Sequence, residues 1–249
     1  MKLFEADLDK IKRAEIQTDP FPHFIVRDFF DPSHLKSIRA DFPREKIRDS
    51  KVTSKSRYTI VHKSENFEGL MHESLVWKRF YEQMCSSKFL QIIKSKYLET
   101  GNFASIENFN SIDLSPQMDI TFARKGYKRG IHLDRGFHFF NSFIYLNGHD
   151  EFGGRGGELQ FHKVKNEGDS YDKFPPQESV ISTKVIPVNG NSLVGFFCCP
   201  WSYHSVVPME DNTGDRDFVY FALNEKHGRD LWPQAKVISE ERRRNFISE

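Results

Sequence analysis

The chain has 249 residues, 38% of them hydrophobic, which is enough to bury a substantial core in one large domain. Its 36 lysine and arginine residues nearly balance 35 aspartate and glutamate residues, so no overall field favours nucleic acid or an anionic membrane. Three cysteines cannot form a disulfide framework and no apolar run approaches bilayer length, so we expect a cytoplasmic protein without nucleic-acid or membrane partners.

Residues 1–100 are expected to form a mainly helical layer. Apolar positions at helical spacing predict a short first helix over residues 3–14, whose charged sequence is unlike a secretion signal. The segment "HFIVRDFF" then predicts a strand. The next segment, "DPSHLKSIRADFP", predicts a helix with Asp31 as its N-cap and Pro32 at its first position.

The second half of this layer begins with a polar stretch. Residues 44–65 are rich in Lys, Arg and Ser and predict a solvated loop, or alternatively a lid over a site. Residues 67–98 predict two helical segments that break near Ser86 and Ser87 and brace a sheet.

Residues 101–225 change to short strand-like runs separated by Gly, Asn, Asp and Pro. The runs are "MDITFA", "NSFIYLN", "GGELQFH", "KVIPV", "SLVGFFC", "SVVPM" and "DFVYFAL". Their spacing predicts a jelly roll, that is, a cupin-like double-stranded β-helix. The expected class is therefore α+β, with this core braced by the N-terminal helices. Residues 226–249 are expected to be a C-terminal extension, helical or tail-like at its charged end, and residues 1–249 a single domain.

A histidine and an aspartate interrupt the apolar pattern in "RGIHLDRGFHFFNSFIYLN". His132 and Asp134 are two positions apart, so in a strand their side chains point to the same face, where a core would prefer apolar groups. His204, in "CCPWSYHSVVPM", begins a strand that would pair near the first one. Two neutral imidazoles and one carboxylate form the facial triad of non-haem iron(II) oxygenases. Each part alone is weak evidence, because a single histidine on a strand is more often structural.

The order of the segments strengthens this interpretation. Over residues 117–223, "GIHLDR", "FIYLN", "GGRGGELQFH", "PVNGNSLVGFF", "YHSVVPM" and "GDRDFVYFAL" follow one another as in the 2-oxoglutarate and iron(II)-dependent dioxygenases. The chain resembles in particular the branch similar to prolyl 4-hydroxylases. The resemblance implies that His132, Asp134 and His204 bind Fe(II), and that the glycine-rich turn at residues 156–157 precedes the next core strand.

The resemblance also implies a binding site for 2-oxoglutarate. Arg216 is expected to hold the far carboxylate of this cosubstrate, for which a guanidinium offers a planar pair of donors. Tyr145 matches the tyrosine that adds a hydroxyl to the same carboxylate; the alternative is plain sheet packing. Two departures concern this part of the site. Arg216 lies twelve residues after His204, a longer gap than is usual in the family, and Phe122 stands where many relatives have a tyrosine.

Other residues of the same segments are expected to be structural. His138 could line the cavity or form a hydrogen bond at the barrel rim, and His162 is predicted at a strand end. Cys198 and Cys199 are expected to be small core residues rather than ligands. Trp201 could wall the pocket or only pack.

The resemblance implies that dioxygen and 2-oxoglutarate are consumed while an unactivated C–H bond is hydroxylated in a small molecule or an amino-acid residue. A protein prolyl hydroxylase acting on a partner and a jelly roll that binds metal or ligand without turnover are the alternatives. Ala222 stands where the nucleic-acid repair branch has a second arginine, so that branch is disfavoured. Iron halogenases lack the carboxylate ligand that this chain keeps as Asp134, so hydroxylation is the expected outcome. Specificity is expected to come from residues 44–65, 125–130 and 163–183. The substrate and the oligomeric state are left open.

Overall fold

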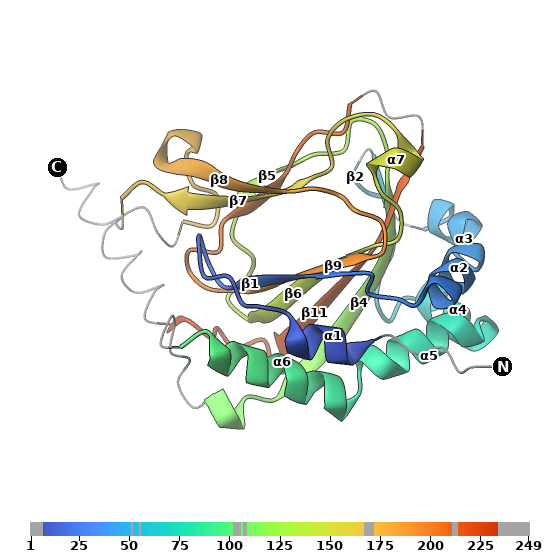
Figure 1. Cartoon of the computed structure of the whole chain (residues 1–249), viewed down its shortest axis with the longest axis horizontal. Coiled ribbons are helices and arrows are strands. Elements are labelled where there is room, and N and C mark those ends of the chain that lie inside the picture. The colour runs from blue at the N-terminus through green and yellow to red at the C-terminus, as the bar shows by residue number, and fades with distance from the viewer. Residues whose placement is uncertain are drawn as a thin grey trace.

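The structure, a computed structural model, contains two antiparallel sheets that face each other, with helices beneath the larger sheet (Figure 1). It describes residues 7–50, 52–54, 56–101, 106, 109–166, 172–210 and 214–233, with residues 52–54 described by their backbone alone. The charged C-terminal segment "SEERRRNFISE" and the start of the predicted first helix lie outside these residues.

Seven strands form the larger sheet and four form the smaller one. The order in the larger sheet is β1 (His23–Arg27), β9 (Ser192–Phe197), β6 (His138–Tyr145), β11 (Arg216–Glu225), β4 (Leu114–Ala123), β3 (Arg57–Ile60) and β2 (Val52–Ser54). The order in the smaller sheet is β5 (Arg129–His132), β10 (His204–Val206), β7 (Leu159–Val164) and β8 (Val180–Ile186). Each strand-like run predicted from the sequence overlaps one of these strands, and the class is a mixture of helices and antiparallel sheet.

The helices lie mainly against the outer face of the larger sheet and at one end of it (Figure 1). They are α1 (Leu8–Arg13), α2 (Pro32–Ala40), α3 (Arg44–Arg48), α4 (Glu65–Glu73), α5 (Leu75–Met84), α6 (Ser87–Glu99) and the short α7 (His149–Phe152). Among the described residues, no helix is long and apolar enough to cross a membrane.

Serine N-caps divide the chain between α4 and α6. The hydroxyl of Ser86 accepts a hydrogen bond from the backbone N–H of Phe89, so the predicted break at this position is confirmed. Ser74 does the same for Trp77, which separates α4 from α5 and makes a second break that the periodicity did not predict. Three helices therefore brace the sheet where two were expected.

The prediction of a loop over residues 44–65 is wrong. This segment forms α3, β2 and β3 and the start of α4. Ile47 and Ile60 are completely buried, and β3 pairs with β4 from Arg57 to Ile60. A few apolar anchors and pairing with an existing sheet edge thus outweigh a polar composition.

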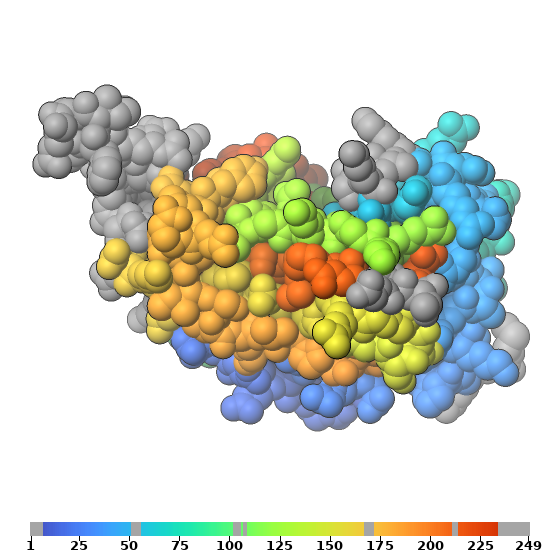
Figure 2. Space-filling view, turned by 90° about the horizontal axis from the view of Figure 1, so that it is seen from above, coloured from blue at the N-terminus to red at the C-terminus, as the bar shows by residue number. Residues whose placement is uncertain are grey.

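The larger sheet buries both of its faces. Ile144 and Val219 are paired across β6 and β11 and point to the helices, where they join the larger apolar core. Their neighbours Tyr145 and Phe218 are also paired and point into the space between the two sheets, where they join a second, aromatic cluster. Figure 2 views the molecule from above and shows the outer surface of the smaller sheet, which covers this space.

Gly195 in β9 tests the packing against the helices. A Cβ at this position would lie 2.7 Å from Cζ of Phe24 and 2.8 Å from Cζ of Phe140, two rings that stack with centroids 5.8 Å apart. Gly195→Ala should therefore lower the free energy of unfolding by about 1–3 kcal/mol, measured by urea denaturation. In Gly69→Ala, the control in α4, the nearest atom would be 3.8 Å away, so the free energy of unfolding should not fall. Equal stability of Gly195→Ala and the unchanged chain would contradict this account of the packing.

Candidate metal centre

The centre of the site is a pair of histidines on neighbouring strands of the smaller sheet. His132 ends β5 and His204 begins β10, and antiparallel pairing places them directly opposite each other. Their ring centroids are 4.3 Å apart and both side chains are buried. The third residue, Asp134, lies just beyond the end of β5 rather than within a strand, where the backbone N–H of Leu133 bonds to the carbonyl of Lys173 at 2.9 Å.

The carboxylate of Asp134 faces both imidazoles. Its Oδ1 lies 3.7 Å from Nε2 of His132, and its Oδ2 lies 3.4 Å from Nε2 of His204. One atom from each of the three residues can be chosen so that all lie within 4.8 Å of one another. Within the described parts of the chain this is the one group of His, Cys, Asp or Glu side chains with such a geometry. The structure thus brings together the three residues that the sequence singled out.

Both imidazoles present an unprotonated Nε2 to this space. Nδ1 of His132 lies 2.9 Å from the carbonyl oxygen of Gly130, and Nδ1 of His204 lies 3.0 Å from that of Ser202. A carbonyl oxygen can only accept a hydrogen bond, so Nδ1 donates in each case. Each Nε2 therefore carries the lone pair with which a histidine binds a metal ion.

Burial favours the neutral form of His132, which is the form that binds a metal ion. Burial, with a further contribution from His204, lowers the pKa of His132 to about 3, so this imidazole is neutral near pH 7. Burial raises the pKa of Asp134, but the neighbouring histidines and the hydrogen bond from Asn141 outweigh it, and the pKa lies below its ordinary value. Two imidazole nitrogens and one carboxylate are a ligand set that fits Fe(II).

A hydrogen-bond chain fixes the carboxylate. Nδ2 of Asn141, in β6, donates to Oδ2 of Asp134. The hydroxyl of Tyr220, in β11, donates in turn to Oδ1 of Asn141 at 2.9 Å. Asn141 is completely buried, so the larger sheet holds the orientation of a carboxylate that belongs to the smaller sheet. The sequence analysis missed Asn141, although its place four residues before Tyr145 on a strand puts both on one face.

Arg216 is a buried cation in the space between the sheets. Its guanidinium carbon lies 5.4 Å from the ring centroid of Tyr127, 5.8 Å from that of Tyr145 and 4.6 Å from that of Phe218. Its Nη1 donates to the carbonyl of Gly157, whereas its Nε has no hydrogen-bond partner. No carboxylate among the described residues lies within 4 Å of this guanidinium. Glu158 acts on it electrostatically from beyond that distance. A buried cation without a counter-ion in contact is costly, so the geometry favours an anion here.

The glycine-rich turn makes this contact possible. Gly157 has a φ of 88°, and a Cβ on it would lie 3.0 Å from Nη1 of Arg216. Glycine therefore provides both the backbone conformation and the close approach.

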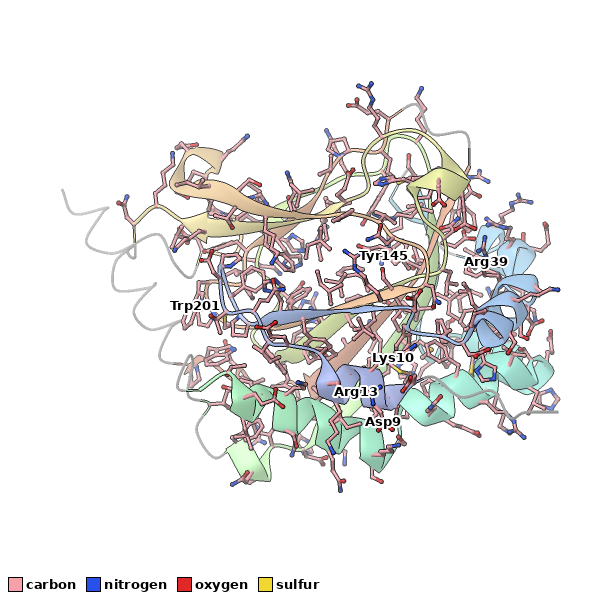
Figure 3. The ribbon with its side chains drawn as sticks, in the orientation of Figure 1. Asp9, Lys10, Arg13, Arg39, Tyr145 and Trp201 are labelled. Carbon is pink, nitrogen blue, oxygen red and sulfur yellow. The ribbon has the colours of Figure 1, made fainter. Side chains whose placement is uncertain are left out.

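Tyr145 lies in the same space, between the two sheets in Figure 3. Burial raises the pKa of its phenol to about 12, so the hydroxyl keeps its proton and can donate a hydrogen bond. Tyr127, which the sequence indicated only as part of the range 125–130, completes the aromatic wall around Arg216.

The remaining candidates have structural surroundings. His138 lies outside the three-residue group. The prediction that His162 lies at a strand end is wrong, because it is inside β7 and buried, with Nε2 2.7 Å from the hydroxyl of Ser205. Cys198 and Cys199 are buried in the aromatic cluster, as predicted. Trp201 packs partly buried against that cluster and is labelled in Figure 3.

Comparison with known proteins supports the fold. No family model matches the sequence, and a comparison with curated proteins finds no match. An oxidoreductase of the 2OG-Fe(II) oxygenase family from Burkholderia pseudomallei superposes with a TM-score of 0.55 at 13% identity, over 93% of this chain and 96% of that chain. A prolyl-4-hydroxylase from Pseudomonas putida gives 0.52 at 12% identity, over 88% and 97%. HygX from Streptomyces hygroscopicus, with nickel, 2-oxoglutarate and hygromycin B bound, gives 0.51 at 9% identity, over 82% and 83%. The chain therefore has the fold of the 2-oxoglutarate and iron(II) oxygenases, which confirms the resemblance at the level of the fold.

Asn141 tests the support of the candidate ligand Asp134. Asn141→Ala removes the hydrogen bond that orients the carboxylate, so the affinity for Co(II), titrated without oxygen, should fall by about 10- to 100-fold. Tyr220→Phe removes only the outer link of the chain and should have a smaller effect. Asn66→Ala, which removes an asparagine in α4, is the control and should leave metal affinity unchanged. An Asn141→Ala protein that binds Co(II) as tightly as the unchanged chain would contradict this role.

Proposed function

We propose that the protein is a 2-oxoglutarate and iron(II)-dependent oxygenase that hydroxylates an unactivated C–H bond in a small molecule or an amino-acid residue. We propose further that the two facing sheets form a double-stranded β-helix and that residues 1–249 are one domain. The observation that carries the proposal is that a His, Asp and His cluster and an unpaired buried arginine share the space between the sheets. These are the two anchors that a metal-chelating keto acid with a distant carboxylate needs.

The metal anchor consists of His132, Asp134 and His204. Their two Nε2 atoms and one carboxylate oxygen would hold Fe(II) on one side and leave the other side open. When bound, Fe(II) and 2-oxoglutarate supply the oxidative decarboxylation that consumes dioxygen, forms succinate and carbon dioxide, and delivers one oxygen atom to the substrate. The protein contributes orientation and a largely apolar surrounding that excludes water.

The cosubstrate anchor is Arg216. Its Nε and the outer face of its guanidinium are available for a carboxylate, which would supply the missing counter-charge. The hydroxyl of Tyr145 can donate to the same group. The rings of Tyr127 and Phe218 hold the guanidinium in place, so the carboxylate is bound in one orientation.

Two observations bear on the setting of the reaction. HygX, which is similar to this chain in fold, was solved with both 2-oxoglutarate and the small molecule hygromycin B bound, whereas another protein of similar fold is a prolyl-4-hydroxylase. Our proposal therefore includes both free and peptidyl substrates.

The three free cysteines support the proposal of a cytoplasmic location.

Turnover separates an oxygenase from a protein that only binds metal. The purified chain, supplied with Fe(II), 2-oxoglutarate and oxygen, should form succinate, and a substrate should increase the rate. His132→Ala or His204→Ala should lower succinate formation at least about 100-fold, because each removes one of three protein ligands. His72→Ala, which removes an exposed histidine in α4, is the control. Tight metal binding without succinate formation under any condition would contradict the proposal and favour a binding protein.

A separate prediction concerns Arg216, the cosubstrate anchor. Arg216→Gln should raise the KM for 2-oxoglutarate by about 10- to 100-fold, because a charge-assisted pair is lost. Since a change at a buried arginine can also destabilise the fold, Tyr145→Phe provides a milder test and should raise the same KM by a smaller factor. Urea denaturation of both variants identifies any loss of stability. An unchanged KM in a folded Arg216→Gln protein would contradict this assignment.

A further inference from the structure

Arg129 faces the metal centre because of an irregularity in β5. His132 pairs with His204 and Arg129 pairs with Val206. Between these two pairs β5 contains one residue more than β10, so the register shifts. Such a bulge turns residues that would alternate to the same face. Val206 belongs to the aromatic cluster between the sheets, and its partner Arg129 lies on the same face of the smaller sheet, with an exposed side chain at its edge.

The guanidinium of Arg129 reaches the ligand atom of the candidate site. Its Nε lies 3.5 Å from Nε2 of His132 and donates toward the lone pair that a metal ion would use. With that lone pair engaged by a metal, this contact has no acceptor, and the guanidinium remains beside the site with its donors available. Among the described residues, no carboxylate lies within 4 Å of Arg129.

The surroundings leave room for a molecule at this point. Arg129 and Gly130 are exposed, and a Cβ placed on Gly130 would meet nothing within 4 Å. β5 is an edge strand of the smaller sheet. Figure 2 shows the green segment that includes this region at the surface. The guanidinium of Arg129 is therefore accessible from outside, while its Nε lies beside His132.

The positive charge of Arg129 is permanent and has no close anionic partner among the described residues. If the proposed function holds, the metal ion takes up the lone pair of His132 that Nε of Arg129 faces, so the guanidinium loses this acceptor. An arginine beside a metal centre, exposed and unpaired, is suited to bind an anionic group of the molecule that enters.

We propose that Arg129 determines specificity by binding an anionic group, a carboxylate or a phosphate ester, of the substrate. This inference rests on the proposed function and names the class of substrate that the site accepts. The anion is held next to the metal centre, so the C–H bond that reacts lies a few atoms away from it. Because binding is charge-assisted, the contact acts mainly on KM.

The experiment uses the full chain loaded with Fe(II) and saturating 2-oxoglutarate. Cell extract, divided by size into metabolites and peptides and then by charge into anionic, neutral and cationic fractions, is assayed for stimulation of succinate formation. Stimulation is expected from an anionic fraction and should be lost after amidation, if the group is a carboxylate, or after phosphatase treatment, if it is a phosphate ester. Arg129→Gln should raise the KM for the stimulating fraction by about 10- to 100-fold. Lys128→Gln removes the exposed neighbouring cation and is the matched control.

The outcomes are distinguishable. If the chain forms no succinate, either with any fraction or without one, the proposed function itself is overturned. Stimulation by a neutral or cationic fraction, or an equal KM for Arg129→Gln and the unchanged chain, would overturn the specificity role alone. A lower affinity of Arg129→Gln for 2-oxoglutarate, measured by calorimetry without substrate, together with an unchanged KM for the fraction, would assign Arg129 to the cosubstrate and also overturn the inference.

Discussion

The pairing of β5 with β10 is the constraint on which the rest of the site depends. These strands come from distant parts of the sequence, yet their antiparallel register places His132 directly opposite His204. Residues opposite each other in such a pair have Cβ atoms about 4.5–5.5 Å apart, which suits two ligands of one metal ion. A shift of the register by one residue would turn one imidazole to the other face of the sheet. The position of the triad is therefore fixed by backbone hydrogen bonds.

The two sheets divide the remaining tasks between them. The smaller sheet supplies the candidate metal ligands, whereas the larger sheet supplies Arg216, Tyr145 and the asparagine that orients Asp134. The contact of Arg216 with the backbone of Gly157 joins the sheets at one point, and the contact of Asn141 with Asp134 joins them at another. Helices on the outer face of the larger sheet bury its apolar side and so hold this arrangement rigid.

The sequence predicted the parts of the site that are encoded by residue type and order. Two histidines and an aspartate amid apolar strands, followed by an arginine, are unusual in composition and in sequence order, so they could be identified without coordinates. The strand β3 could not, because its stability comes from pairing with β4 rather than from its own polar sequence. The bulge that places Arg129 beside His132 is a property of the register between two strands and has no signal in either strand alone. Strand alternation could have placed Asn141 on the same face as Tyr145. Its contact with Asp134 could not be predicted, because it depends on how the two sheets lie relative to each other.

The most direct test of the central claim is the position of the metal ion in crystals grown without oxygen in the presence of Fe(II) and 2-oxoglutarate. Anomalous diffraction at the iron edge should give one peak, bonded to Nε2 of His132, Nε2 of His204 and one carboxylate oxygen of Asp134. The keto acid should occupy adjacent positions, with its far carboxylate at Arg216. An iron peak elsewhere, or one bonded to the histidines while Asp134 points away, would contradict the account.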